Sequence, residues 1–308
     1  MRVFRQNIVI DGDSYGKLIA RVRSLGAKSA HPPSKASNSA SSNSVAVPRG
    51  GTLADPTGAT TALGDAQELY EKTVEVYTTE YEDSVEEVLN EVNLRRSGKA
   101  VLRAIVQQIT NLAVTPWLGK GSIDSPNAIT RAIKAADATP RGEPVRDARG
   151  NVVDPTRTGT GRGSSAEIEF LPYKCASGVE GAKEQADPSK HAAGTLPDEI
   201  IVHELVHALL FMSGKSYSSP VPNQHLYDNQ DDFFAILIAN VYRSECGRLE
   251  SRLHHYGFES DELKSGKFLR TWENRYTVRK LRRDLPSLFS DLHDVRADFN
   301  PFRRMLDI

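Results

Sequence analysis

The clearest pattern along the chain is a helical repeat of apolar positions between Ala66 and Asn93. Tyrosine and valine recur there at steps of three and four residues, with acidic residues between them, which predicts one long amphipathic helix. Ser97 and Gly98 interrupt the pattern, and a second apolar face follows from Ala100 to Ile109. We interpret both apolar faces as core packing.

Shorter segments alternate apolar and polar residues with the period of a β-strand. They are Val3 to Ile10, Leu112 to Trp117 and Ala166 to Leu171. Asp11 to Ser14 is typical of a turn, and a short helix is expected to follow it from Tyr15 to Leu25. Together these elements predict an α+β fold that is mostly helical and contains a small sheet.

Between residues 26 and 64 the composition shifts to serine, alanine, proline and glycine, with almost no large apolar side chains. Such a segment cannot bury enough apolar surface to offset the entropy that it would lose on ordering. We therefore expect an N-terminal strand and helix at 1–25, a disordered linker at 26–64 and one large domain at 65–308.

A second polar stretch, Gly119 to Gly163, is expected to form a loop or hairpin. It ends in the run GTGRG, which superficially resembles a phosphate-binding loop. That run lacks a following Lys-Ser/Thr pair and precedes a strand, whereas phosphate binding requires the N-terminus of a helix.

A further apolar segment carries the residues with the clearest chemistry. Thr195 and Pro197 are typical of a helix start, and the EIIVHELVHALLFM that follows is apolar on nearly every side, which predicts a buried helix. His203 and His207 are four residues apart, so their imidazoles project from the same face and can bind one metal ion. Glu204 is offset by about 100° around the helix, close to the ion without having to ligate it.

This arrangement suits zinc-dependent hydrolysis. A catalytic zinc ion keeps an open coordination position, in which a bound water becomes an effective nucleophile near neutral pH. Glu204 would act as the general base that takes a proton from this water and later delivers it to the leaving amine nitrogen.

The third metal ligand has to come from another part of the chain. Asp231 and Asp232 directly precede an apolar run, ending near Glu245, that predicts the next helix. We expect Asp232 to ligate the metal, with Asp231 as the alternative. Either carboxylate can instead cap the helix, and Asp231 can orient a ligand imidazole. His225, in the preceding polar loop, is a rival ligand that would complete a three-histidine site.

Composition limits the remaining classes of function. The chain has 308 residues, with 39 Lys and Arg against 40 Asp and Glu, so its net charge of -1 gives no general attraction to nucleic acid or anionic lipid. Its two cysteines are far apart and argue against a disulfide framework. No segment is long and apolar enough to span a membrane, and residues 1–10 lack the apolar core of a Sec signal peptide. We expect a soluble protein that, if it is exported, uses a non-Sec route.

In its motifs the sequence resembles the NleD-like zinc metallopeptidase family of bacterial secreted effectors and toxins. The similarity rests on LPDEIIVHELVHAL and the downstream NQDDFFAILIANVYRSECGR, with support from IVIDGDSY, SGKAVLRAI and FNPF. It covers residues 3–25 and about 94–301.

The resemblance implies a zinc endopeptidase that is secreted and acts on a protein substrate in the cytosol of a target or host cell. A secretion chaperone or an immunity protein is a further partner to consider. The family's motif carries over to His203 and His207 as ligands, Glu204 as the base and Asp231 or Asp232 as the third ligand. The family usually has glutamate at the third position, whereas this chain offers only aspartate, which is one methylene shorter.

Two further groups of residues are candidates for binding. The oxyanion of a tetrahedral intermediate needs a stabilising donor, and the candidates are Tyr227, Tyr242, His254, His255 and Tyr256. The basic segment from Arg270 to Arg283 predicts a helix whose charged side faces solvent or an acidic partner.

We therefore expect a zincin-like α+β domain that uses zinc to hydrolyse peptide bonds in a protein substrate. The competing class is a non-catalytic interaction protein whose metal is structural or absent. A zinc amidase acting on cell-wall peptides is a third alternative.

Overall fold

The computed structural model describes residues 1–17, 20–21, 56–117, 128–147, 151–172, 193–221, 227–248, 251–254, 257–258 and 268–305. The chain divides into two compact units, one of residues 1–11 and 82–308 and one of residues 12–81. The first unit contains the whole sheet and every described residue of the predicted metal site.

A five-stranded sheet with the strand order β1-β2-β3-β5-β4 lies in the first unit. Its strands are β1 (Arg2–Arg5), β2 (Ile8–Ile10), β3 (Leu112–Pro116), β4 (Ala128–Ala132) and β5 (Ala166–Phe170). β2, β3 and β5 are parallel, whereas β1 and β4 run antiparallel to their neighbours at the two edges. Alternate residues of β3 and β5 are fully buried, because one face of the sheet packs against helices.

The helices account for most of the described structure. They are α2 (Pro56–Leu94), α3 (Arg96–Val106), α4 (Ala135–Ala138), α6 (Pro197–Met212), α7 (Gln230–Glu245), α9 (Trp272–Asp284), α10 (Pro286–His293) and α11 (Pro301–Arg304). The structure also contains a two-stranded sheet of β6 (Arg252–His254) and β7 (Gly257–Phe258) and the 3-10 helix η2 (Phe268–Arg270). Residues 13–17 and 20–21 are helical as well.

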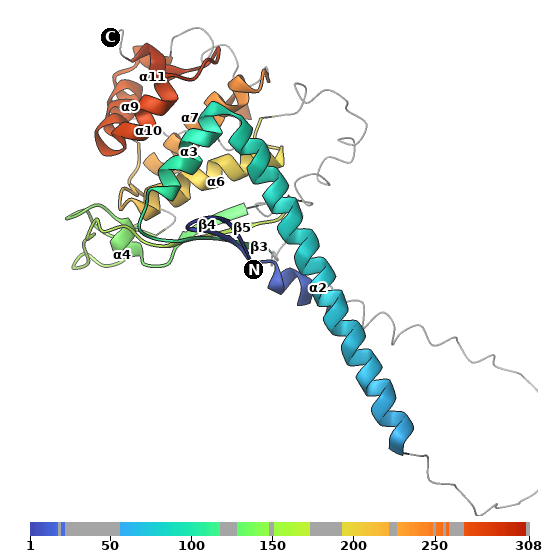
Figure 1. The fold of residues 1–308 in the computed structure, drawn as a ribbon. Coiled ribbons are helices and arrows are strands. Elements are labelled where there is room, and N and C mark those ends of the chain that lie inside the picture. Colours follow the sequence, from blue (N-terminus) through green and yellow to red (C-terminus); the bar gives the residue numbers. More distant parts are fainter. Residues whose placement is uncertain are drawn as a thin grey trace, which may run out of the picture. The chain divides into compact units, whose positions relative to one another are not determined.

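Helix α6 packs against β4 and β5, with α3 and α7 packed against α6 in turn (Figure 1). The C-terminal helices α9 to α11 form a further cluster that contacts α3 and α7. The prediction of a mixed α+β fold, mostly helical with a small sheet, is therefore confirmed. Within the described ranges, no helix has both the length and the hydropathy needed to cross a membrane.

The N-terminal segment forms a hairpin, so the prediction of a single strand from Val3 to Ile10 is wrong. Gln6 and Asn7 turn the chain between β1 and β2. The side-chain amide of Asn7 is held by the carbonyls of Ile105 and Thr110, at 2.9 and 3.0 Å. The polar run of Arg5, Gln6 and Asn7 was the available sign of this turn.

Helix α2 begins well before the predicted start at Ala66, and residues 56–64 belong to it although we expected them to be disordered. Pro56 suits the first turn, because the N–H that proline lacks would have no partner there. The rest of the predicted linker, residues 26–55, lies outside the described residues. In the second unit, Gly16 approaches α2 so closely that a Cβ would lie 2.3 Å from the carbonyl oxygen of Val74.

The polar stretch from Gly119 to Gly163 contains β4 and α4, which the sequence analysis missed. Its GTGRG run has a packing role, because it lies against the C-terminal end of α6. A Cβ at Gly163, whose φ is +86°, would lie 2.1 Å from the carbonyl oxygen of Met212. A Cβ at Gly214, with φ +67°, would lie 2.5 Å from that of Gly161.

Candidate metal centre

The site is built on the antiparallel pair of helices α6 and α7, which pack closely together. Asp198 near the start of α6 contacts Tyr242 near the end of α7, whereas His203 further along α6 meets Asp232 at the start of α7. Most side chains of both helices are buried, since α6 is apolar on nearly all sides. Polar groups on such helices have to find partners on the facing helix.

Three potential ligand atoms converge where the two helices meet. The Nε2 atoms of His203 and His207 are 3.1 Å apart, and His203 Nε2 lies 3.7 Å from Oδ1 of Asp232. All three ligand atoms lie within 4.8 Å of one another. A tetrahedral ion with bonds of about 2.0–2.1 Å separates its ligand atoms by about 3.3 Å. These residues can therefore hold one metal ion with only small adjustments.

Two of the three residues of the cluster are buried, and the third is partly exposed. His203 and Asp232 are 6% and 2% exposed, whereas His207 is half-buried. A catalytic metal site needs such an opening, because substrate and water have to reach the ion.

Asp231 has a different role from its neighbour Asp232. Its carboxylate accepts hydrogen bonds from Ser216 Oγ at 2.5 Å and from the Tyr217 backbone N–H at 2.6 Å, in the loop that follows α6. Burial raises the pKa of Asp231, and these two hydrogen bonds act in the opposite direction. Neither aspartate caps α7, because the Asn229 side chain accepts the N–H of Asp232 instead. The structure thus brings Asp232, and not Asp231, to the histidines.

Glu204 is half-buried and contacts the edge of the sheet. Its Oε2 atom accepts a hydrogen bond from Thr130 Oγ1 at 2.6 Å, and the same hydroxyl lies 3.2 Å from the Glu204 backbone oxygen. Sequence reasoning missed Thr130 because β4 lies in a stretch that we expected to be a loop. The alternation of the segment AITRA was the available signal.

Of the proposed oxyanion donors, Tyr227 lies beside the cluster. It is only 8% exposed and packs edge-on against Phe233, with ring centroids 4.8 Å apart. Burial, and to a lesser extent the charge of Asp232, raises the pKa of Tyr227, so its hydroxyl keeps its proton. Tyr242 lies at the opposite end of the helix pair, where it donates a hydrogen bond to Asp198.

The other candidates are not described at the level of side chains. His254 ends β6, but its side-chain position falls outside the described structure. His255, Tyr256 and the rival ligand His225 lie outside the described residues altogether.

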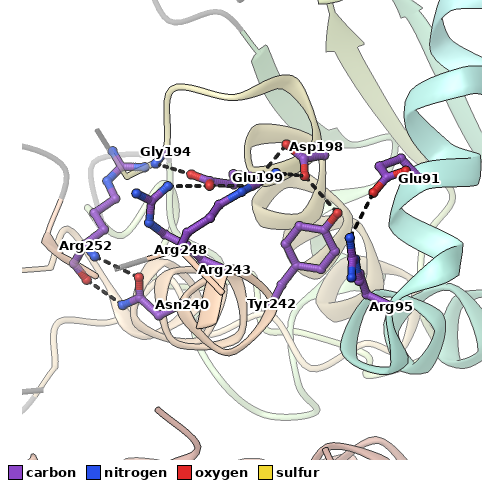
Figure 2. Close-up of polar contacts among 10 residues, drawn as sticks. All are labelled: Glu91, Arg95, Gly194, Asp198, Glu199, Asn240, Tyr242, Arg243, Arg248 and Arg252. Atoms are coloured by element: carbon purple, nitrogen blue, oxygen red, sulfur yellow. Dashed lines mark hydrogen bonds and ion pairs between the residues drawn. The ribbon is translucent and has the colours of Figure 1, made fainter. Parts of the chain in front are cut away.

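A buried network of charges, which we call the arginine clamp, joins the start of α6 to the end of α7 (Figure 2). Its members are Asp198, Glu199, Tyr242, Arg243 and Arg248. Arg243, 1% exposed, and Arg248 each donate to Glu199 Oε1 at 2.5 Å. Arg248 and Tyr242 also donate to Asp198 Oδ2, at 2.7 and 2.9 Å.

Helix α6, which carries the two carboxylates of the arginine clamp, starts differently from the prediction. Leu196 is the N-cap of α6 and makes no side-chain cap, so the prediction that Thr195 caps this helix is wrong. The carboxylates of Asp198 and Glu199 lie in the first turn of α6, where the helix dipole stabilises negative charge. Glu199 also accepts the backbone N–H of Gly194 at 2.6 Å (Figure 2).

The predicted basic helix is α9, but its cations face different ways. Arg279, Arg282 and Arg283 are exposed. Lys280 instead points toward α7, where its Nζ donates to Gln230 Oε1 at 2.5 Å and lies 3.0 Å from the centroid of the Tyr217 ring. The charged side that we expected to face solvent is therefore made by arginines alone.

The chain matches no protein-family model, no curated protein and no solved structure. The resemblance of its motifs to the NleD-like zinc metallopeptidases therefore stays a prediction. The case for a function rests on the convergence of His203, His207 and Asp232, with Glu204 directly following His203 in sequence.

Proposed function

We propose that this protein is a zinc-dependent endopeptidase with a zincin-like catalytic domain. The proposal rests above all on one observation: two imidazole nitrogens and a carboxylate oxygen, from two different helices, lie within 4.8 Å of one another. Two histidines and a carboxylate form a familiar ligand set for catalytic zinc. When bound, the ion supplies Lewis acidity and lowers the pKa of a water molecule.

The remaining chemistry falls to side chains of the chain itself. His203, His207 and Asp232 would bind the ion, and Glu204, next to His203 in sequence, would act as the general base. Its carboxylate would take a proton from the attacking water and deliver it to the leaving amine. The protonated hydroxyl of Tyr227 is the best-placed candidate to donate a hydrogen bond to the developing oxyanion.

The substrate class and the biological setting rest on the motif resemblance. We propose a protein substrate in a target or host cell, reached after secretion by a non-Sec route. The exposed arginines of α9 offer a surface on which an acidic partner could dock.

Metal content distinguishes the roles of the two aspartates. Protein purified without chelator should carry about one zinc ion per chain, measured by mass spectrometry of the metal. The Asp232→Ala variant should lose most of the zinc, because one of three ligands is missing. Asp231→Ala should keep it while losing stability, because the Ser216 hydroxyl and the Tyr217 N–H would lose their acceptor.

Asp228→Ala is the matched control, because Asp228 is an exposed carboxylate in the segment just before α7. It should bind zinc as the native protein does. Native protein without zinc would exclude the enzymatic proposal and favour the interaction protein.

Cleavage is tested by comparing the terminal peptides of target-cell lysate treated with native protein or with Glu204→Gln. We expect new peptide termini with the native protein and a loss of at least about 10³-fold with the variant, whose zinc content should be unchanged. If cell-wall digests alone yield products, the activity is that of an amidase. If zinc-loaded native protein cleaves nothing, the catalytic proposal fails.

A further inference from the structure

We infer that Thr130 is a positioning residue for the general base: its hydroxyl holds one oxygen of Glu204 so that the other remains free for proton transfer. This inference rests on the proposed peptidase function. It starts from the 2.6 Å hydrogen bond between Thr130 Oγ1 and Glu204 Oε2. That length is typical of a hydroxyl donating to an ionised carboxylate, which is among the stronger hydrogen bonds in proteins.

The edge strand β4 is built to make this contact. Thr130 of β4 lies opposite Ile168 of β5 in the antiparallel pairing of the two strands. This register fixes the position of Thr130 along the edge of the sheet. Ala128 and Ala132 share the face of Thr130, since side chains alternate along a strand. Their small side chains allow α6 to approach β4 closely enough for the short threonine side chain to reach Glu204.

Threonine suits the task better than a longer polar side chain would. Its β-branch restricts rotation about χ1, so the hydroxyl has few alternative directions. The hydroxyl also lies 3.2 Å from the backbone oxygen of Glu204, so both acceptors within reach of its single proton belong to the same residue. One carboxylate oxygen of a half-buried, otherwise rotatable glutamate is thereby fixed.

The catalytic consequence is a matter of alignment. A general base has to lie within hydrogen-bonding distance of the proton that it removes, and a misplacement of about 1 Å can cost about 10²-fold in rate. Thr130 touches none of His203, His207 and Asp232 through a hydrogen bond in the described structure. Its loss should therefore affect proton transfer and leave metal binding intact.

The test compares Thr130→Val, which keeps the shape and removes the donor, with Thr130→Ser, which keeps the donor. On a peptide containing the cleavage site found in lysate, Thr130→Val should lower kcat about 10- to 100-fold. KM should stay within about twofold and zinc content should be unchanged, because the loss is confined to the transition state. Thr130→Ser should recover most of the rate.

Thr115→Val is the matched control. Thr115 Oγ1 donates to Glu167 Oε1 at 3.0 Å across β3 and β5, so the same kind of threonine–glutamate pair is broken away from the cluster. This variant should retain the native kcat. Equal losses in both valine variants would mean that Thr130 acts only through the stability of the sheet, which overturns the inference.

A second measurement does not depend on activity. The unfolding equilibrium constant is measured for Thr130→Val, for Glu204→Ala and for the double variant. The effect of the double variant should differ about tenfold from the product of the two single effects, because both substitutions remove the same hydrogen bond. Zero coupling overturns the inference. Native protein that binds zinc but cleaves nothing overturns the proposed function, whereas a fully active Thr130→Val variant overturns only the role of Thr130.

Discussion

Adjacent residues of the site have opposite surroundings. Asp231 turns its carboxylate to the backbone and hydroxyl of the loop after α6, whereas Asp232 turns its carboxylate to the two histidines. Successive side chains on a helix differ in direction by about 100°, so two identical residues can serve a loop and a metal ion. Aspartate reaches His203 without the extra methylene of glutamate because the antiparallel α6 and α7 lie close together.

We expect a different residue, Lys280, to make the free energy of unfolding depend on pH. Burial lowers the pKa of Lys280 to about 8, from an ordinary value of 10.5. The charged groups that face it are Asp284, Asp231 and Glu143, which raise the pKa, and Arg283, which lowers it. Between about pH 8 and 10.5 the unfolded chain binds more protons than the folded protein, so the free energy of unfolding should rise with pH.

The rise should amount to about 1 kcal/mol, since the partly exposed ammonium is screened by solvent. It is measured by urea unfolding at about pH 7.5 and 9.5, below the range in which Tyr217, with a pKa raised to about 12, loses its proton. The Lys280→Met variant should lack this increment. Identical pH profiles for the two proteins would contradict the prediction.

That His203 and His207 lie together was predictable from sequence, because four-residue spacing on a helix leaves little freedom in where side chains point. The choice between Asp231 and Asp232 was open, because the packing of α7 against α6 decides which side of α7 faces the histidines. The segment AITRA could at most have indicated a strand, because the contact of Thr130 with Glu204 depends on the register of β4 on β5.

At the scale of elements, two contacts set the position of α7 along α6. The metal cluster joins the middle of α6 to the start of α7, and the arginine clamp joins the start of α6 to the end of α7. Buried ion pairs contribute little net stability but strongly disfavour other arrangements, since each displaced charge would remain buried without its partner. The clamp thus disfavours sliding of α7 along α6, which would separate Asp232 from the histidines.

Breaking the arginine clamp should therefore be costly. Arg243→Met removes the most deeply buried cation of the clamp. It leaves the carboxylate of Glu199, which is only 2% exposed, with one guanidinium partner fewer. We expect the free energy of unfolding of metal-free protein to fall by about 3 kcal/mol, measured in urea. The zinc affinity should fall as well, because the helix pair carries all three ligands.

The control for this variant is Arg103→Met. Arg103 forms an ion pair with Asp291 at 3.1 Å, but its side chain is 53% exposed. Removing an exposed pair of this kind should cost less than about 1 kcal/mol. Comparable losses in the two variants would show that burial of the clamp has no special effect.

Sequence patterns predicted best those elements whose apolar residues recur in step with the side that they bury. Strands β3 and β5 and helix α3 were recognised from such periods, and α6 and α7 from their apolar runs. The N-terminal hairpin and β4 were missed, because a two-residue turn and a short edge strand leave few apolar positions to count. The conformation of these segments depends instead on tertiary contacts, such as those of Asn7 and Thr130.

For the whole molecule, the important fact is that one compact unit contains the complete site. Thr130, His203 and Asp232 are far apart in sequence, yet all belong to the unit of residues 1–11 and 82–308. The chain leaves this unit after residue 11 and returns at Glu82. Both points lie near β1, because Arg2 pairs with Ile10 and the Met1 amine contacts Glu82 at 2.6 Å.

Residues 12–81 should therefore be dispensable for the metal centre. We expect a variant in which a Gly/Ser linker of about eight residues replaces them to fold and to bind about one zinc ion per chain. Circular dichroism and metal analysis test this. A folded variant that binds no zinc would show that the second unit is required for the site.

The contact between the GTGRG run and α6 has a consequence for tracing the ancestry of this protein. Gly163 and Gly214 combine positive φ values with backbone atoms where a Cβ would stand, so no other amino acid fits either position without moving the helix end. Proteins that descend from a common ancestor and keep this junction should keep both glycines. Distant relatives can thus be recognised by a signature of three parts in order along the chain. These are a glycine-rich run, a strand, and an HExxH motif with glycine seven residues after its second histidine.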